Sequence, residues 1–210
     1  MRKRKAEIIE KATDLFYKHG FVKASIRDIV KAVGITNSTV YIYFENKDEI
    51  LYTIIVDIGE ILLKEIRSAI EAHDDPVECL REMIFRQICI IKSKRKQIKI
   101  YMEEQYQLPP VLQKKVYKQH RLIYDLYFDT ISKIKEKGIT RPINETVMTF
   151  SVFAMMNWST RWYDSQGSLP IEEIAEQTIS LFFGGIFKEG VLENNERFSP
   201  LVEDFIEEGH

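Results

Sequence analysis

One stretch near the N-terminus decides the fold: Gly20 to Leu51 reads GFVKASIRDIVKAVGITNSTVYIYFENKDEIL. It predicts a short helix over Ser25–Val33, a turn at residues 34–36 and a second short helix over Asn37–Phe44. Two short helices joined by three or four residues with a central glycine are typical of a helix-turn-helix. Polar residues open the second helix, which suits a recognition helix whose N-terminal end meets base edges in the major groove of DNA.

This stretch resembles the DNA-binding domain of the TetR/AcrR family of transcriptional repressors. The residues that carry the resemblance are Gly20, Ser25, Ile29, Gly34, Thr39, the Tyr41-x-Tyr43-Phe44 block, Lys47 and Leu51. One position departs from the family pattern: Ser38 stands where the family usually has glycine. We expect this difference to alter which DNA base is recognised at that position but not to disturb the fold. The resemblance implies a helix-turn-helix DNA-binding domain over residues 1–47 and a helical ligand-binding and dimerisation domain over residues 48–210.

The resemblance also implies which residues contact DNA, and their chemistry suits the role. Ser25, at a helix N-terminus, can offer a hydroxyl and a backbone N–H to phosphate. The phenolic O–H groups of Tyr41 and Tyr43 can donate to phosphate oxygens, although both rings could instead belong to the core. We expect the DNA contacts to come from Ser25, Thr36, Asn37, Ser38, Thr39, Tyr41, Tyr43 and Lys47, with residues 37–39 reading bases and Lys47 clamping a phosphate.

The rest of the chain is patterned for helices. Asn46 with Glu49 forms a capping box that opens a long helix, and the Asp74-Asp75-Pro76 sequence ends it. Residues Phe150 to Trp158 are apolar nearly all round, which predicts burial on more than one side. A last long helix is expected from Ile171 to about Phe187. Sustained period-two alternation is missing from the sequence, so we predict an all-α fold of about nine helices.

Charge and composition narrow the class of protein. Residues 1–47 hold ten Lys and Arg against five Asp and Glu, a net charge of +5, whereas the remaining residues carry 20 against 27, a net charge of −7. A basic head on an acidic body suits a protein whose head meets phosphates, although a basic tail can also be merely solvated. Short apolar runs argue against a membrane span, and Cys79 and Cys89 are spaced too far apart on a helix to pair. We expect a cytoplasmic protein without disulfides.

One short recognition helix reads too few bases, so two copies are expected about 34–36 Å apart on a palindromic operator. The last two long helices are the expected dimer surface. Gly184 and Gly185 lie deep in an apolar helix, where each glycine costs about 1 kcal/mol relative to alanine. Close approach of a second helix would offset that cost, and fraying of the helix end at Gly184 is the alternative.

Two features of the body bear on a ligand. Lys92-Ser93-Lys94-Arg95-Lys96 with Lys99 is the densest cation cluster outside the N-terminal tail. The segment from Asn157 to Asp164, with Gly167 to Pro170 and Ile171 to Ala175 after it, resembles the acyl-CoA-responsive branch of the family. An acyl-CoA calls for clustered cations, an aromatic ring for adenine and an apolar tunnel. We expect ligand contacts from Arg95, Lys99, Tyr106, Tyr124, Phe128, Trp158, Arg161 and Trp162. The alternatives are a solvated helix end for the lysines, a salt bridge for Arg161 and plain core for the aromatics.

These observations favour a homodimeric repressor that a small-molecule effector, most of all an acyl-CoA, releases from its operator to control fatty-acid or acyl-CoA metabolism. A repressor of an efflux pump that senses a lipophilic cation through Glu103, Glu104 or Asp125 is an alternative, as is a DNA-binding dimer without an effector. An enzyme is not expected, because the four histidines lack metal-ligand spacing and neither a Ser/His/acid set nor a glycine-rich phosphate loop is evident. The sequence indicates no metal site and no cofactor.

Overall fold

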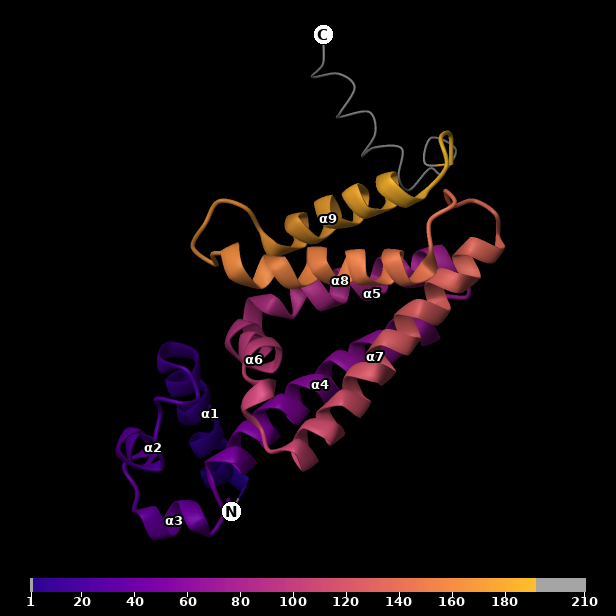
Figure 1. The fold of residues 1–210 in the computed structure, drawn as a ribbon. Coiled ribbons are helices and arrows are strands. Elements are labelled where there is room, and N and C mark those ends of the chain that lie inside the picture. Colours follow the sequence, from indigo (N-terminus) through magenta and orange to yellow (C-terminus); the bar gives the residue numbers. More distant parts are fainter. Residues whose placement is uncertain (1, 192–210) are drawn as a thin grey trace. The chain divides into compact units, whose positions relative to one another are not determined.

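The computed structural model describes residues 2–191, and these fold almost entirely into helices (Figure 1). This part of the chain contains no strand beyond an isolated bridge between Thr140 and Phe187, so the predicted all-α fold of about nine helices is confirmed. The α-helices are α1 Arg2–His19, α2 Ile26–Val33, α3 Asn37–Tyr41, α4 Lys47–Ala72, α5 Pro76–Cys89, α6 Ile91–Glu103, α7 Pro110–Glu136, α8 Glu145–Trp162 and α9 Ile171–Ile186, with a short 3-10 helix at Gln105–Gln107.

The helices group into two compact units. Of the described residues, 2–64 and 93–122 form the N-terminal unit, and 65–92 and 123–191 form the C-terminal unit. Helices α4, α6 and α7 contribute residues to both units. The expected boundary between the DNA-binding and ligand-binding domains, between residues 47 and 48, lies at the start of α4. The two compact units therefore do not coincide with the two expected functional domains. The functional division stays a prediction.

Local signals set the helices of the N-terminal unit. Ser25 caps α2 in a complete capping box with Asp28, and Gly34 ends that helix with a φ of 73°. Thr36 caps α3 by accepting a hydrogen bond from the Thr39 N–H. The prediction that this helix continues to Phe44 was wrong: α3 ends at Tyr41, because the chain turns so that Phe44 becomes buried before α4 begins.

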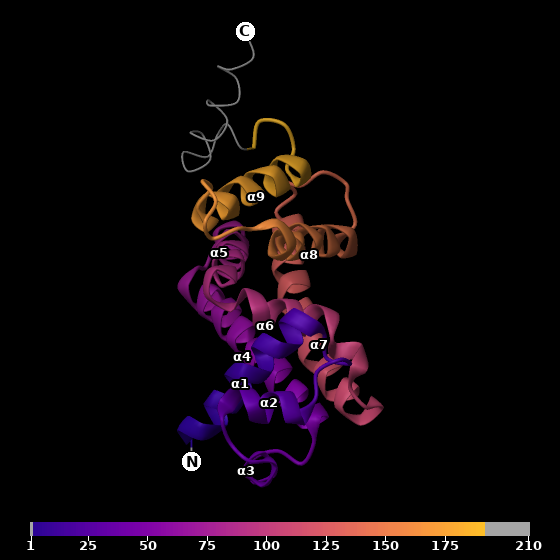
Figure 2. The same cartoon turned by 90° about the vertical axis from the view of Figure 1, so that its left-hand side faces the viewer.

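The C-terminal unit is built around α5, α8 and α9, with α9 packed against both of the other helices (Figures 1 and 2). Apolar residues at helical spacing, among them Ile171, Ile179 and Phe183, form the buried face of α9. An ion pair between Arg81 of α5 and Glu176 of α9 adds a contact between these two helices. Buried apolar area, with this ion pair at its edge, thus fixes α9.

Helix α8 differs from expectation. Val152 and Met156 are buried, but Phe150 is 58% and Trp158 is 64% exposed. The prediction that this segment is buried on more than one side is therefore wrong for the single chain. Helix α8 is apolar on two sides, and one of these sides is largely exposed in the part of the chain that the structure describes.

Candidate functional site

The start of α2 is held by hydrogen bonds in both directions between Ser25 and Asp28, and the Asp28 N–H donates to Ser25 Oγ at 3.2 Å. The Ser25 hydroxyl donates to Oδ2 of Asp28 at 2.6 Å, and the Ser25 backbone N–H donates to the same oxygen at 2.9 Å. These two bonds lower the pKa of the Asp28 carboxyl, the hydroxyl contributing most. Ser25 is exposed, so the residue expected to meet a phosphate lies on the surface, but its hydroxyl proton is engaged by Asp28.

The expected base-reading residues lie together on the first turn of α3. The Thr36 hydroxyl lies 2.8 Å from the Ser38 hydroxyl and 2.9 Å from the Thr39 hydroxyl. Asn37, Ser38 and Thr36 are exposed and Thr39 is half-buried. The Asn37 amide forms no hydrogen bond to any residue in the described range 2–191, so both its donor and its acceptor face solvent. This turn therefore presents an amide and a group of mutually bonded hydroxyls at the protein surface, where a partner outside the chain can reach them.

The three aromatic residues that follow separate into surface and core. Tyr41 is 56% exposed, whereas Phe44 is only 2% exposed. Tyr43 is half-buried between them in the sequence. Phe44 therefore fills the core position, and the Tyr41 hydroxyl is available to a partner outside the chain.

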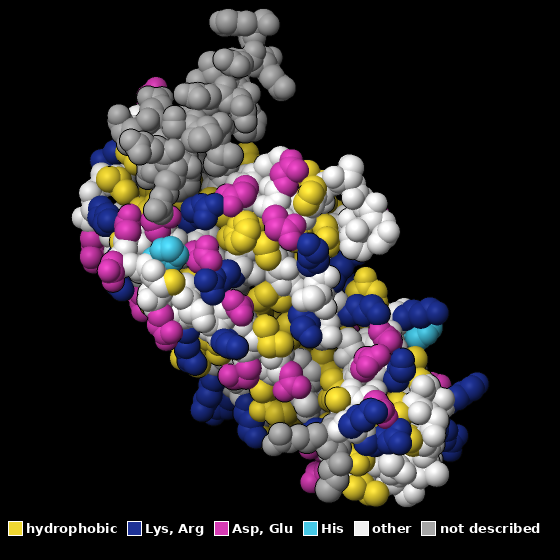
Figure 3. Space-filling view, turned by 180° about the vertical axis from the view of Figure 1, so that it is seen from behind, with side chains coloured by type: hydrophobic (Ala, Val, Ile, Leu, Met, Phe, Trp, Pro, Cys, Tyr) yellow, Lys and Arg dark blue, Asp and Glu magenta, His cyan; other side chains and the backbone are white. Residues whose placement is uncertain are grey.

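Lys47 lies in a different environment from the one expected. Its Nζ donates to the Phe21 carbonyl at 2.9 Å and to the Ala24 carbonyl at 2.9 Å, and it lies 4.1 Å from the centre of the Phe21 ring. Two of its three ammonium protons thus hold the loop between α1 and α2, which leaves one for a phosphate. Figure 3 shows lysine and arginine side chains at its lower right, among polar, apolar and a few acidic ones.

The expected ligand residues do not form a single group within either unit. In the N-terminal unit, the Lys99 ammonium lies 4.8 Å from the centre of the Tyr17 ring on α1, Arg95 is half-buried and Tyr106 is 65% exposed. Two neighbouring lysines of the cation cluster form ion pairs, Lys92 with Glu172 at 2.8 Å and Lys96 with Asp14 at 2.5 Å. Much of the cluster therefore has a structural partner.

In the C-terminal unit the expected ligand residues form two aromatic groups. Tyr124 stacks on Phe128 with ring centres 5.7 Å apart, and Phe150 lies 5.4 Å from Tyr124. The Arg161 guanidinium lies 5.8 Å from the centre of the Trp158 ring. Trp162 is 50% exposed on the same helix. The first group is an apolar surface, and the second places a cation beside an exposed indole.

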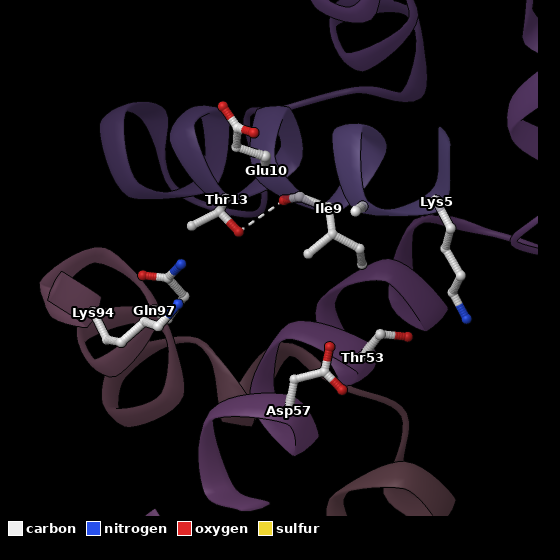
Figure 4. A pocket seen from close by; sticks show the side chains of 9 residues that line it. Lys5, Ile9, Glu10, Thr13, Thr53, Asp57, Lys94 and Gln97 are labelled. Atoms are coloured by element: carbon white, nitrogen blue, oxygen red, sulfur yellow. Dashed lines mark hydrogen bonds between the residues drawn. The ribbon is translucent and has the colours of Figure 1, made fainter. Parts of the chain in front are cut away.

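Sequence reasoning missed a recess of about 560 Å³ within the N-terminal unit (Figure 4). Ile9 and Thr13 of α1, Asp57 of α4 and Lys94 and Gln97 of α6 lie around it. Partial burial raises the pKa of the Asp57 carboxyl. The lining residues come from three segments far apart in the sequence, so no local pattern marks the recess. The one feature of the sequence that could have pointed to the recess is Asp57, a carboxylate between the buried apolar residues Ile55 and Ile58 of α4.

The described residues hold no cluster of three or more His, Cys, Asp or Glu side chains that could bind a metal ion. None of the helices within residues 2–191 is both long and apolar enough to cross a membrane. Cys79 and Cys89 are free thiols, as expected.

Comparison with known proteins places these features in a family. Residues 8–53 match the family described as "Bacterial regulatory proteins, tetR family", and residues 73–186 match "Tetracyclin repressor-like, C-terminal domain". The HTH-type transcriptional repressor KstR2 of Mycobacterium tuberculosis is 25% identical over 198 residues, which cover 90% of this chain and 95% of that protein.

Solved structures share the fold. The ketosteroid transcriptional regulator KstR2 of Mycobacterium tuberculosis superposes with a TM-score of 0.83 at 23% identity, covering 89% of this chain and 96% of the other. AibR in complex with isovaleryl coenzyme A and operator DNA gives a TM-score of 0.80 at 24% identity, covering 87% and 99%. With a helix-turn-helix at one end and a family match over more than half its length, the chain belongs to the TetR family of bacterial transcriptional regulators and is not an enzyme.

Proposed function

We propose that the chain is a homodimeric repressor that binds a palindromic operator through residues 1–47 and is released by an acyl-CoA bound to residues 48–210. The observation that carries the DNA-binding part is the first turn of α3, where Asn37, Ser38 and Thr36 are exposed and the Asn37 amide has no partner among the described residues. A solvent-facing amide and hydroxyls on a capped helix suit readout of base edges.

The DNA contacts divide by chemistry. Asn37, Ser38 and Thr39 read bases, and an asparagine amide pairs best with adenine. Tyr41 donates its hydroxyl to a phosphate, and Ser25, Thr36 and Tyr43 add contacts to the backbone around it. Lys47 contributes through its remaining ammonium proton while it holds the loop before α2. Backbone contacts set the position of the helix, and the base contacts set the sequence that it prefers.

The exposed apolar sides of α8 and α9 form the dimer surface. Val147, Phe150 and Leu181 are each more than half exposed in the single chain. Side chains of this kind rarely stay in water when they recur on one helix side. A Cβ added at Gly184 or Gly185 would meet nothing within 4 Å, so the two glycines leave a bare helix surface for a second helix. Helix α9 continues to Ile186, which favours close approach over fraying at Gly184.

The effector proposal rests on the two aromatic groups of the C-terminal unit. Tyr124 and Phe128 offer apolar rings to an acyl chain, and Trp158 with Arg161 offers an indole for adenine and a guanidinium for phosphate. The likeness to AibR, solved with isovaleryl coenzyme A, and to KstR2 supports this class of ligand. Of the carboxylates named for the lipophilic-cation alternative, Glu104 accepts a hydrogen bond from the Phe21 N–H and so is engaged within the fold.

A direct test measures binding of the purified dimer to labelled duplexes selected from a random library, by fluorescence anisotropy at fixed salt. We expect Tyr41→Phe to weaken binding about tenfold, because one charge-assisted hydrogen bond to phosphate is lost, while Tyr117→Phe, at an exposed tyrosine outside the expected sites, has no effect. Unchanged binding by Tyr41→Phe, or a monomeric protein, would contradict the proposal.

The effector is tested on the same complex. Isovaleryl-CoA and palmitoyl-CoA are added separately, with free coenzyme A as control. We expect at least one acyl-CoA to weaken DNA binding 5- to 150-fold, the usual range of coupling between two sites. Arg161→Ala should abolish this response and Arg67→Ala, an exposed arginine of α4, should not. If no acyl-CoA has an effect, the effector assignment fails and the DNA-binding proposal stands.

A further inference from the structure

We propose that Glu104 is a positioning residue for DNA binding: it holds the loop between α1 and α2 from the end of α6 and thereby sets the orientation of the helix-turn-helix. This inference rests on the proposed DNA-binding function. Glu104 touches no part of the expected DNA surface, and it acts through the backbone of Phe21.

The contact joins residues 83 positions apart. Glu104 Oε1 accepts the Phe21 backbone N–H at 3.2 Å. A Cβ built at Gly20 would lie 3.6 Å from the same oxygen, and Gly20 has a φ of +79°, which glycine adopts without strain. The chain thus turns sharply under the carboxylate and presents an amide to it.

The two polar groups of Phe21 are held from two different helices. Its N–H is bound by Glu104, and its carbonyl accepts from Lys47, which also binds the Ala24 carbonyl. Ser25, the cap of α2, follows directly. The start of α2 is therefore fixed by one carboxylate from the end of α6 and one ammonium from the start of α4.

Side-chain contacts matter here because the space between α1 and α6 is poorly filled. The recess of about 560 Å³ in Figure 4 opens between Thr13 of α1 and Gln97 of α6. A second recess of about 250 Å³ is lined by Phe16, Gly20 and Glu104 among others. Contacts such as the Lys96–Asp14 ion pair span this space. With little close packing, a charge-assisted hydrogen bond has a large share in holding α1 and α6 together.

Charge alone predicts the opposite effect from positioning. Removing an acidic side chain makes a DNA-binding protein less negative, which strengthens its attraction to phosphates. A positioning role predicts weaker binding instead, because the loop that leads into α2 loses one of the two side chains that bind the Phe21 backbone. The sign of the change therefore separates the two explanations.

The test compares Glu104→Ala, Glu104→Gln and Glu104→Asp with Glu10→Ala, which makes the same charge change at an exposed residue of α1. Operator affinity is measured by anisotropy at several salt concentrations, and exchange of the Phe21 amide hydrogen is followed by NMR. We expect Glu104→Ala to weaken binding about tenfold and to speed Phe21 exchange at least tenfold. The slope of affinity against salt should not change, because no phosphate contact is lost.

The other two Glu104 variants separate the effect of side-chain length from the effect of the negative charge. Glu104→Gln keeps an acceptor oxygen and should stay within about threefold of wild type, whereas Glu104→Asp keeps the charge but shortens the reach and should behave like Glu104→Ala. Glu10→Ala should bind DNA at least as tightly as wild type.

Tighter or unchanged binding by Glu104→Ala would overturn the proposal, and so would equal losses in the Ala and Gln variants. If Glu104→Ala does not fold, Glu104→Asp decides. If the wild type binds no duplex, the proposed function fails, and unchanged Phe21 exchange in the variants would still refute the contact itself.

Discussion

Replacing Gly59 by alanine should destabilise the protein, although alanine is the better helix former. Gly59 is buried in α4, and a Cβ built there would lie 1.9 Å from Oε1 and 2.3 Å from Cδ of Gln119 on α7. Gln119 is itself buried, and its Nε2 donates to the Val56 carbonyl at 3.3 Å and to Glu60 Oε1 at 3.0 Å. The new methyl group can be accommodated only if the Gln119 amide moves and releases these bonds.

The magnitude follows from opposing effects. Helix propensity alone favours alanine over glycine by about 1 kcal/mol. Losing the bond to Val56 costs about 1 kcal/mol and losing the bond to the charged Glu60 about 2 kcal/mol. The expected net loss is about 2 kcal/mol in the free energy of unfolding, which lowers the Tm of a protein of this size by about 4–8 °C.

A double-mutant cycle makes the test specific. Gly59→Ala, Gln119→Ala and the double variant are unfolded in urea at one fixed protomer concentration, because the stability of a dimer depends on concentration. We expect the double variant to be more stable than the sum of the single changes by at least 1 kcal/mol, since the clash is absent when Gln119 is gone. A stabilised Gly59→Ala variant, or strict additivity, would refute the reasoning.

Three further predictions concern charge, a thiol and assembly. Hydrogen bonds from Ser25 lower the pKa of Asp28, so its carboxylate stabilises the fold above its ordinary pKa of 3.8 and this contribution is lost as the pH falls through the lower folded value. Asp28→Asn should therefore flatten the acid dependence of the Tm below about pH 5, and an unchanged profile would argue against the capping role. Burial raises the pKa of Cys89 to about 11, so its alkylation by iodoacetamide should keep accelerating from pH 8 to pH 10, and a plateau near pH 9 would contradict this. Leu181→Glu should convert the proposed dimer to a monomer in sedimentation velocity, whereas Val111→Glu, at a similarly exposed apolar residue, should not.

Short-range chemistry explains why the helix-turn-helix could be predicted. The Ser25 cap, the turn at Gly34 and the Thr36 cap each depend on residues within three or four positions. The end of α3 was misplaced because burial of Phe44, a tertiary effect, decides where the chain turns. The sequence correctly predicted that α8 is apolar on two sides. Within the described residues, one of these sides is buried and the other is largely exposed.

The sequence by itself determined the all-α fold, the position of the helix-turn-helix and the contrast between a basic head and an acidic body, because these follow from composition and from near neighbours along the chain. Only the tertiary structure decided that Lys47 binds two carbonyls, that Lys99 faces Tyr17, and that Glu104 anchors the Phe21 amide. A long side chain can reach many partners from one backbone position. Its partner is fixed only when helices distant in sequence have packed together.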